Sequence, residues 1–303
     1  MANINSFKYE SINLIFFKSS MTYMTKEDWN KYILPNLNDD KSFNYELNQI
    51  IKIQNVFVDL LDLIFPKEAH NRLRQNILYS SMIYYYKYIL FNQISHSSIS
   101  LEEKILLCLS CIFIAFKAEN KAISIEYLKD KGLPYLNDQI KKDYQKEKFI
   151  EMIFDREFKI LISFECNANI DNPYIFLRHI KTYLEKIKIQ KDIISEVIKG
   201  INNYLNDTLL FPLYLYFTSY EIFLSCTLLV IKTKKYNFFN FNDIIKLTNI
   251  EINKDNINQC ATYISKISNA LEEKRTDSKP QKQITFINND LNFTNLLSIN
   301  VNQ

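Results

Sequence analysis

Apolar residues recur along this chain at the three- and four-residue spacing of amphipathic helices. In the segment 43–64, Leu47, Ile50 and Leu61 fall on one helical face, and the pattern stops before Pro66. The same spacing predicts further helices over 72–91, 101–117, 124–129, 146–166, 174–187, 190–211, 219–232, 241–247 and 255–273. We therefore predict an all-α fold.

One segment is repeated. The helix predicted at 101–117 is apolar almost all round, which indicates burial inside a bundle. Its part Leu109–Lys117 has the sequence LSCIFIAFK, and Leu224–Lys232 has LSCTLLVIK, 224 − 109 = 115 residues later. Small residues at the middle of a buried helix let its neighbours approach closely. A capping box precedes each copy, at Ser100–Glu103 and Thr218–Glu221.

The repeat divides the chain into tandem five-helix units. We expect the first unit over 43–170 and the second over 171–272. An N-terminal helical extension would occupy 1–42, and a long C-terminal helix would be followed by a polar tail over 273–303. The extension contains Trp29, and we expect it to pack against the first unit or against a partner.

Composition supports the helical prediction. The chain has only 2 glycines and 6 prolines, too few for the many tight turns of sheet folds. We expect Gly132 and Pro134 to lie in the loop before the helix at 146–166. The net charge of +3 is close to neutral for 303 residues and implies no strong field toward nucleic acid or membranes.

Two apolar runs could be mistaken for membrane spans. Ile105–Phe116 is too short to cross a bilayer of about 30 Å. Leu209–Ile231 is long enough, but Pro212 and Glu221 interrupt it. We predict buried helices and no membrane span.

The sequence contains no recognisable catalytic constellation. There is no glycine-rich phosphate loop, and His70, His96 and His179 lie in separate segments. The spacing of Cys108 and Cys111 resembles a metal half-site, but no second pair follows. We therefore predict no enzymatic activity, no cofactor and no metal. The odd number of cysteines, mostly in apolar stretches, predicts reduced core residues, namely Cys108, Cys111, Cys166, Cys226 and Cys260.

Over about 43–272 the chain resembles the cyclins. The segment Ile114–Glu119, IAFKAE, is similar to the pattern that ends their third helix, namely an apolar residue, Ala, any residue, Lys, any residue and Glu. The stretch from Leu205 to Tyr216 is similar to the transcription-type cyclins C, K, L and T. The Asn172–Tyr174 junction and the long C-terminal helix resemble cyclin H most closely.

The resemblance implies a site for a partner kinase. In cyclins, a lysine at the end of helix 3 and a glutamate of helix 5 hydrogen-bond the kinase backbone beside its regulatory helix. These roles fall on Lys117 and Glu157, with Asp155 as the alternative if the register slips by two. The apolar contacts beside them would be Ile114 and Leu161.

The chain also departs from the family. Cys166 stands where many cyclins have a Phe late in helix 5, so the kinase contact there would be smaller. The first helix lacks the Met-Arg-Ala-Ile-Leu docking motif of cell-cycle cyclins, which puts substrate recruitment through that patch in doubt.

The function implied is regulatory. A cyclin H-like subunit would bind and activate a cyclin-dependent kinase that phosphorylates other such kinases and the RNA polymerase II tail. The resemblance also allows a third assembly subunit and implies a nuclear location. It implies no direct contact with nucleic acid. The alternative is a nucleic-acid-binding module like transcription factor IIB, which uses the same paired fold. That family carries a zinc ribbon and a strongly basic second unit, and this chain lacks both. A helical scaffold without a kinase partner is the third hypothesis.

Overall fold

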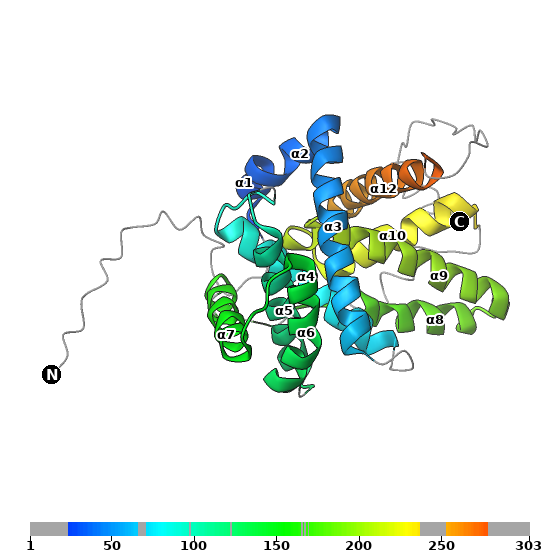
Figure 1. Cartoon of the computed structure of the whole chain (residues 1–303). Helices are drawn as coiled ribbons and strands as arrows, with labels where there is room; N and C mark the ends of the chain where they lie inside the picture. The colour runs from blue at the N-terminus through cyan, green and yellow to red at the C-terminus, as the bar shows by residue number, and fades with distance from the viewer. Residues whose placement is uncertain are drawn as a thin grey trace.

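The computed structural model describes residues 24–65, 71–96, 98–121, 123–164, 166, 168, 170–236 and 253–277. Within these ranges the regular elements are all helical, which confirms the predicted all-α fold (Figure 1). The elements are α1 (Lys26–Asp28), the π-helical η1 (Trp29–Ile33), α2 (Leu34–Asn38), α3 (Asp40–Ile64), α4 (Asn71–Phe91), α5 (Leu101–Ala118), α6 (Ile125–Ile140), α7 (Lys146–Ile162), the 3-10 turn η2 (Pro173–Phe176), α8 (Leu177–Lys186), α9 (Lys191–Asp207), the 3-10 turns η3 (Thr208–Leu210) and η4 (Leu213–Leu215), α10 (Ser219–Lys234) and α12 (Lys254–Asp277). The predicted helix at 241–247 lies outside the described residues.

The helix α5 is the centre of the five helices α3 to α7. Every residue from 105 to 116 is buried, and α3, α4, α6 and α7 all pack against it. Figure 1 shows α5 enclosed among these helices. None of the helices in the described ranges is long and apolar enough to cross a membrane.

The helix α10 holds the corresponding place in the second part of the chain. Its residues from 219 to 231 are all buried, and it packs against α9, α12 and η2. The capping box predicted at its start is present. The Thr218 hydroxyl accepts a hydrogen bond from the Glu221 backbone N–H, and the Glu221 carboxylate accepts one from the Thr218 backbone N–H. Two orphan donors of the first turn are thereby satisfied.

The repeated serines make the same contact in both central helices. The Ser110 hydroxyl lies 2.9 Å from the Leu106 carbonyl oxygen of its own helix and 3.3 Å from the Ile153 carbonyl oxygen of α7. The Ser225 hydroxyl lies 2.7 Å from the Glu221 carbonyl oxygen and 2.9 Å from the Ile257 carbonyl oxygen of α12. The repeat seen in the sequence is therefore a repeat of contacts, and it makes α12 the counterpart of α7.

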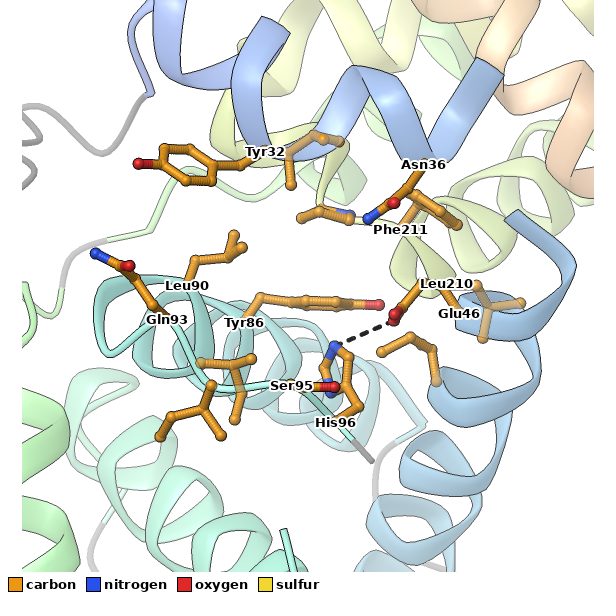
Figure 2. Close-up of a pocket in the computed structure, with 15 residues that line it drawn as sticks. Tyr32, Asn36, Glu46, Tyr86, Leu90, Gln93, Ser95, His96, Leu210 and Phe211 are labelled. Carbon is orange, nitrogen blue, oxygen red and sulfur yellow. Dashed lines mark ion pairs between the residues drawn. The ribbon is translucent and has the colours of Figure 1, made fainter. Parts of the chain in front are cut away.

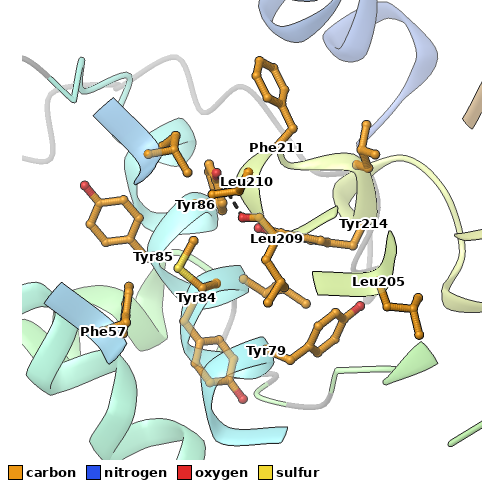
Figure 3. Packing of buried hydrophobic residues seen from close by; sticks show 14 of the residues in the cluster. Phe57, Tyr79, Tyr84, Tyr85, Tyr86, Leu205, Leu209, Leu210, Phe211 and Tyr214 are labelled. Atoms are coloured by element: carbon orange, nitrogen blue, oxygen red, sulfur yellow. Dashed lines mark hydrogen bonds between the residues drawn. The ribbon is translucent and has the colours of Figure 1, made fainter. Parts of the chain in front are cut away.

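The tyrosine-rich helix α4 joins the two halves of the chain. The Tyr86 hydroxyl donates to the Leu209 carbonyl oxygen over 3.3 Å. The rings of Tyr79 and Tyr86 both lie 5.9 Å from the ring of Tyr214, in edge-to-face arrangements. Figure 3 shows these rings beside the segment that connects α9 to α10. Predicted as helix to residue 211, this segment instead leaves α9 at Asp207 and continues in 3-10 turns.

The prediction for the fourth helix was wrong in extent. α6 does not stop at residue 129 but continues through Gly132 and Pro134 to Ile140. An interior Pro costs about 3 kcal/mol and an interior Gly about 1 kcal/mol relative to Ala. Each apolar side chain that is fully buried stabilises the fold by about 1.5 to 3 kcal/mol, and this gain offsets the cost. Those buried in α6 are Leu128, Leu133 and Leu136. A Cβ at Gly132 would lie only 2.7 Å from the Leu109 side chain, so the glycine allows α6 to approach α5.

The described part of the N-terminal extension packs against both parts of the chain: α2 contacts α3 of the first unit, and Trp29 packs against the second part. Residues 1–23 of the predicted extension lie outside the described residues. Trp29 is fully buried, and its ring stacks on Tyr216 at 4.8 Å between centroids. The edge of Phe217 and the ring of Tyr263 on α12 complete its surroundings. The Lys266 ammonium of α12 also donates to the Leu37 carbonyl oxygen over 2.8 Å. Aromatic contacts therefore fix Trp29 to α12 and to the segment just before α10.

We predict that Trp29→Ala destabilises the chain by about 3 to 5 kcal/mol, the usual cost of removing a fully buried aromatic side chain. Asn30→Ala, the exposed neighbour, should change stability by less than about 0.5 kcal/mol. Urea unfolding followed by circular dichroism measures both. Equal midpoints for the two variants would contradict the packing described for Trp29.

Candidate partner-binding site

Lys117 and Glu157, 40 residues apart in sequence, form an ion pair. Lys117 lies in the last turn of α5, where the buried helix reaches the surface, and Glu157 lies on α7. The Lys117 Nζ is 2.6 Å from the Glu157 Oε1, and the side chains are 49% and 11% exposed. The structure thus brings together the two charged residues predicted for the site.

Of the two acids considered for this position on α7, only Glu157 contacts Lys117. Asp155, the alternative acid, pairs with Lys159 of the same helix over 2.7 Å and is half exposed. It takes no part in the contact with Lys117. The acid that faces α5 is therefore Glu157.

Two phenylalanines extend the site from the ion pair. The Lys117 Nζ lies 3.9 Å from the centre of the Phe113 ring, a cation–π distance. The Phe113 ring in turn lies 6.2 Å from the ring of Phe154 on α7. Phe113 is itself buried, so it links the ion pair to the half-exposed Phe154 as one cluster of charged and aromatic groups of α5 and α7.

A row of exposed apolar side chains runs along α7, starting at Phe154. Phe154, Phe158 and Ile162 are spaced by four residues and are 45%, 66% and 48% exposed. We call these three residues the α7 apolar row. The opposite face of α7 buries its own apolar residues, Phe149, Ile153 and Ile160. This row was not predicted from the sequence, although the spacing of four is a visible signal of a second apolar face.

Arg156 holds α7 in this orientation. Its guanidinium donates to both carboxylate oxygens of Glu103 in the first turn of α5, with Nε 3.1 Å from each. This contact also corrects the prediction for the start of α5. The Ser100 hydroxyl accepts from the Glu103 backbone N–H as expected, but the Glu103 carboxylate binds Arg156, and no complete capping box is formed.

The remaining predicted contacts are placed less favourably for a partner. Ile114 is almost fully buried inside α5, and Leu161 is partly buried. Cys166 is exposed but lies beyond α7, which ends at Ile162 and not at 166. The helix ends early because Cys166 takes a left-handed backbone conformation, with φ of 60°, and donates its N–H to the Leu161 carbonyl oxygen.

The arrangement is suited to binding. An ammonium offers three donors and a carboxylate several acceptor positions, so the pair can bond to main-chain groups of a partner. The row adds apolar surface that a partner can cover. Across the described ranges there is no group of three His, Cys, Asp or Glu residues that could hold a metal ion. Cys108 and Cys111 are buried in α5, and burial raises the pKa of both thiols.

We predict that Arg156→Met lowers the free energy of unfolding by about 1.5 to 3 kcal/mol, because it leaves the Glu103 carboxylate without its charged partner. Lys159→Met is the matched control on the same helix. It breaks only the exposed pair with Asp155 and should cost less than about 0.5 kcal/mol. Urea denaturation compares the two, and similar losses would show that Arg156 does not anchor α7.

No family model and no curated protein matches the sequence. Solved structures do match. A chain of the yeast RNA Pol II CTD kinase CTDK-1 complex aligns with a TM-score of 0.58 at 14% identity, covering 88% of this chain and 86% of that one. A chain of the yeast TFIIK (Kin28/Ccl1/Tfb3) complex aligns with a TM-score of 0.50 at 16% identity, covering 80% of this chain and 96% of that one. A chain of the CAK complex from Chaetomium thermophilum bound to ATP-gamma-S aligns with a TM-score of 0.46 at 13% identity, covering 77% of this chain and 70% of that one. The protein therefore shares its all-helical fold with chains of the two yeast complexes.

Proposed function

We propose that this chain is a cyclin-type regulatory subunit that binds and activates a cyclin-dependent kinase and has no catalytic activity of its own. The observation that carries the proposal is the Lys117–Glu157 pair beside the exposed α7 apolar row. The fold shared with a chain of an RNA polymerase II tail kinase complex supports it. The sequence pattern around Lys117 supports it independently.

In the proposed complex, a helix of the kinase lies against the α7 apolar row. Lys117 and Glu157 bond to main-chain groups at the end of that helix and hold it inward, in the active arrangement of the kinase. Each charge-assisted bond in a partly desolvated contact contributes about 1.5 to 3 kcal/mol. Lys117 needs little reorganisation for this role, because Glu157 and the Phe113 ring already fix its ammonium in place.

The counterpart of α7 in the second half of the chain, α12, offers no equivalent site. The serine contacts relate α7 to α12 by 257 − 153 = 104 residues. With this offset, Glu157 corresponds to Ala261 and Phe158 to Thr262. The acid and the largest exposed ring are both absent there. We therefore assign kinase binding to the first unit alone.

We further propose that the subunit is of the transcription type, nearest to cyclin H, and that its kinase acts on other cyclin-dependent kinases and the RNA polymerase II tail. The two yeast complexes with which it shares its fold support this, since one is an RNA Pol II CTD kinase and the other contains three named polypeptides. A third assembly subunit and a nuclear location are part of the same proposal.

The nucleic-acid hypothesis gains no support from the surface of α8 to α10. Lys234 pairs with Glu196, and Lys181 lies 3.9 Å from Glu185. Basic side chains that neutralise a phosphate backbone need to be available as a patch. These lysines are partly neutralised within the chain.

We predict that Lys117→Ala combined with Glu157→Ala abolishes capture of the kinase by the tagged chain. The thermal midpoint should change little, because the double variant removes both charges together and leaves neither buried without its partner. The matched control is Lys181→Ala with Glu185→Ala, an exposed pair on α8. Mass spectrometry identifies the captured kinase, and phosphate transfer to a peptide measures its activation. A double variant that still captures and activates the kinase would refute the site.

A second prediction concerns the α7 apolar row. Phe158→Ser should weaken kinase binding at least tenfold, because the exposed ring would be covered in the complex. Its effect on stability should stay below about 0.5 kcal/mol, since the side chain is 66% exposed in the free chain. Tyr45→Ser, which alters an exposed ring on α3, serves as the control. Titration of the purified kinase by calorimetry gives the ratio, and unchanged affinity would exclude the row from the interface.

A further inference from the structure

A cavity of about 300 Å³ lies where the N-terminal extension meets the rest of the chain. Five parts of the chain line it, one of which is the segment Gln93–His96 that follows α4. The extension contributes Tyr32 and Asn36, α3 contributes Glu46, α4 contributes Tyr86 and Leu90, and the connection before α10 contributes Phe211. Figure 2 shows the Glu46 carboxylate turned toward the cavity, facing Tyr86 and His96. The cavity is separate from Lys117, Glu157 and the α7 apolar row.

Glu46 gives this cavity a negative charge that the lining does not balance. Its side chain is 26% exposed, and burial raises the pKa of the carboxyl above its ordinary value. The nearest basic group in the described lining is His96, with Nε2 4.0 Å from Oε2 of Glu46. Burial, and then the charge of Lys104, lower the pKa of His96 to about 4, so the ring is neutral at pH 7. None of the described lining residues is Lys or Arg.

The remaining lining favours a cation with an apolar body. Three aromatic side chains, those of Tyr32, Tyr86 and Phe211, line the cavity, and aromatic rings can attract ammonium groups. Leu90 and its neighbours offer aliphatic surface. A half-buried carboxylate without a cation is costly, and a bound ammonium would relieve that cost. An anion would be repelled by the Glu46 carboxylate.

We propose that this cavity binds a small organic ammonium, with its charged head on Glu46 and its apolar body against Tyr86 and Leu90. The volume is at the lower end of pockets that enclose small molecules and suits one ring with a short amine chain. Because both the extension and α3 line the cavity, the ligand would hold the extension to the body of the chain. Binding would therefore raise the unfolding temperature.

Three probes that share one body and differ in charge test this proposal: 2-phenylethylamine, 2-phenylethanol and phenylacetate. Trp29 is the only tryptophan and precedes Tyr32 by less than one helical turn, so its fluorescence reports binding. Calorimetry on the full chain gives the affinities. We expect the amine to bind at least tenfold more tightly than the alcohol, the acid not to bind, and only the amine to raise the unfolding temperature.

Two variants and one control localise the site. Glu46→Gln should weaken amine binding at least tenfold, the usual effect of losing one charge-assisted bond. Leu90→Trp keeps the carboxylate but fills the cavity, and it should abolish binding. Glu126→Gln, an exposed carboxylate on α6, should leave the affinity unchanged. Circular dichroism confirms that each variant is folded, and if Glu46→Gln is not, Leu90→Trp decides.

The proposal is overturned if the amine and the alcohol bind alike, or if the amine shows no binding at millimolar concentration. It is equally overturned if a folded Glu46→Gln or Leu90→Trp variant keeps the wild-type affinity. Binding of a lysine-bearing peptide in place of the amine would assign the cavity to a protein partner and would also refute it. None of these results bears on kinase capture through Lys117.

Discussion

A helix that is apolar all round is stable in water only when other helices surround it, and α5 and α10 are two such helices. The burial of α5 and α10 determines how the others are arranged, because each must be covered on every side. Inside them, the hydroxyls of Ser110 and Ser225 are satisfied by backbone carbonyl oxygens. The buried stretch of α5, residues 105 to 116, contains no charged residue. Lys117 is therefore placed at the surface, beside α7, by the same constraint that forms the core.

Much of this architecture could be predicted from periodicity and caps. The predicted bounds of α4 and α5 agree with the structure to within one residue. The bounds of α6 do not, because its path through Gly132 and Pro134 depends on packing against α5 and not on local preference. The partner of Trp29 was beyond prediction for a similar reason. A buried aromatic is evident in sequence, but which of two units buries it depends on the path of the chain.

The geometry of the candidate site was predicted in part, through family resemblance. Lys117 and Glu157 lie together as that resemblance implies. The α7 apolar row was missed, since α7 has apolar residues on two faces and periodicity does not tell which face the core covers. Glu103 shows the same limit. Its spacing from Ser100 fits a capping box, yet a stronger partner, Arg156, was brought to it by the tertiary fold.

Corresponding faces of α12 and α7 differ in exposure: the N-terminal extension covers the face on α12, whereas the face on α7 is exposed. Tyr263 and Lys266 of α12 correspond to Lys159 and Ile162 of α7, and the extension covers them through Trp29 and Leu37. The α7 face is left open. Covering its half-exposed row would contribute roughly 2 to 5 kcal/mol, at about 1.5 to 3 kcal/mol for each fully buried side chain. Association of two proteins costs about 4 to 15 kcal/mol, so the row alone cannot hold a partner. On α12 the covering segment belongs to the same chain and does not meet that cost. A separate partner on α7 must be held by further bonds, and the paired charges of Lys117 and Glu157 are in position to supply them.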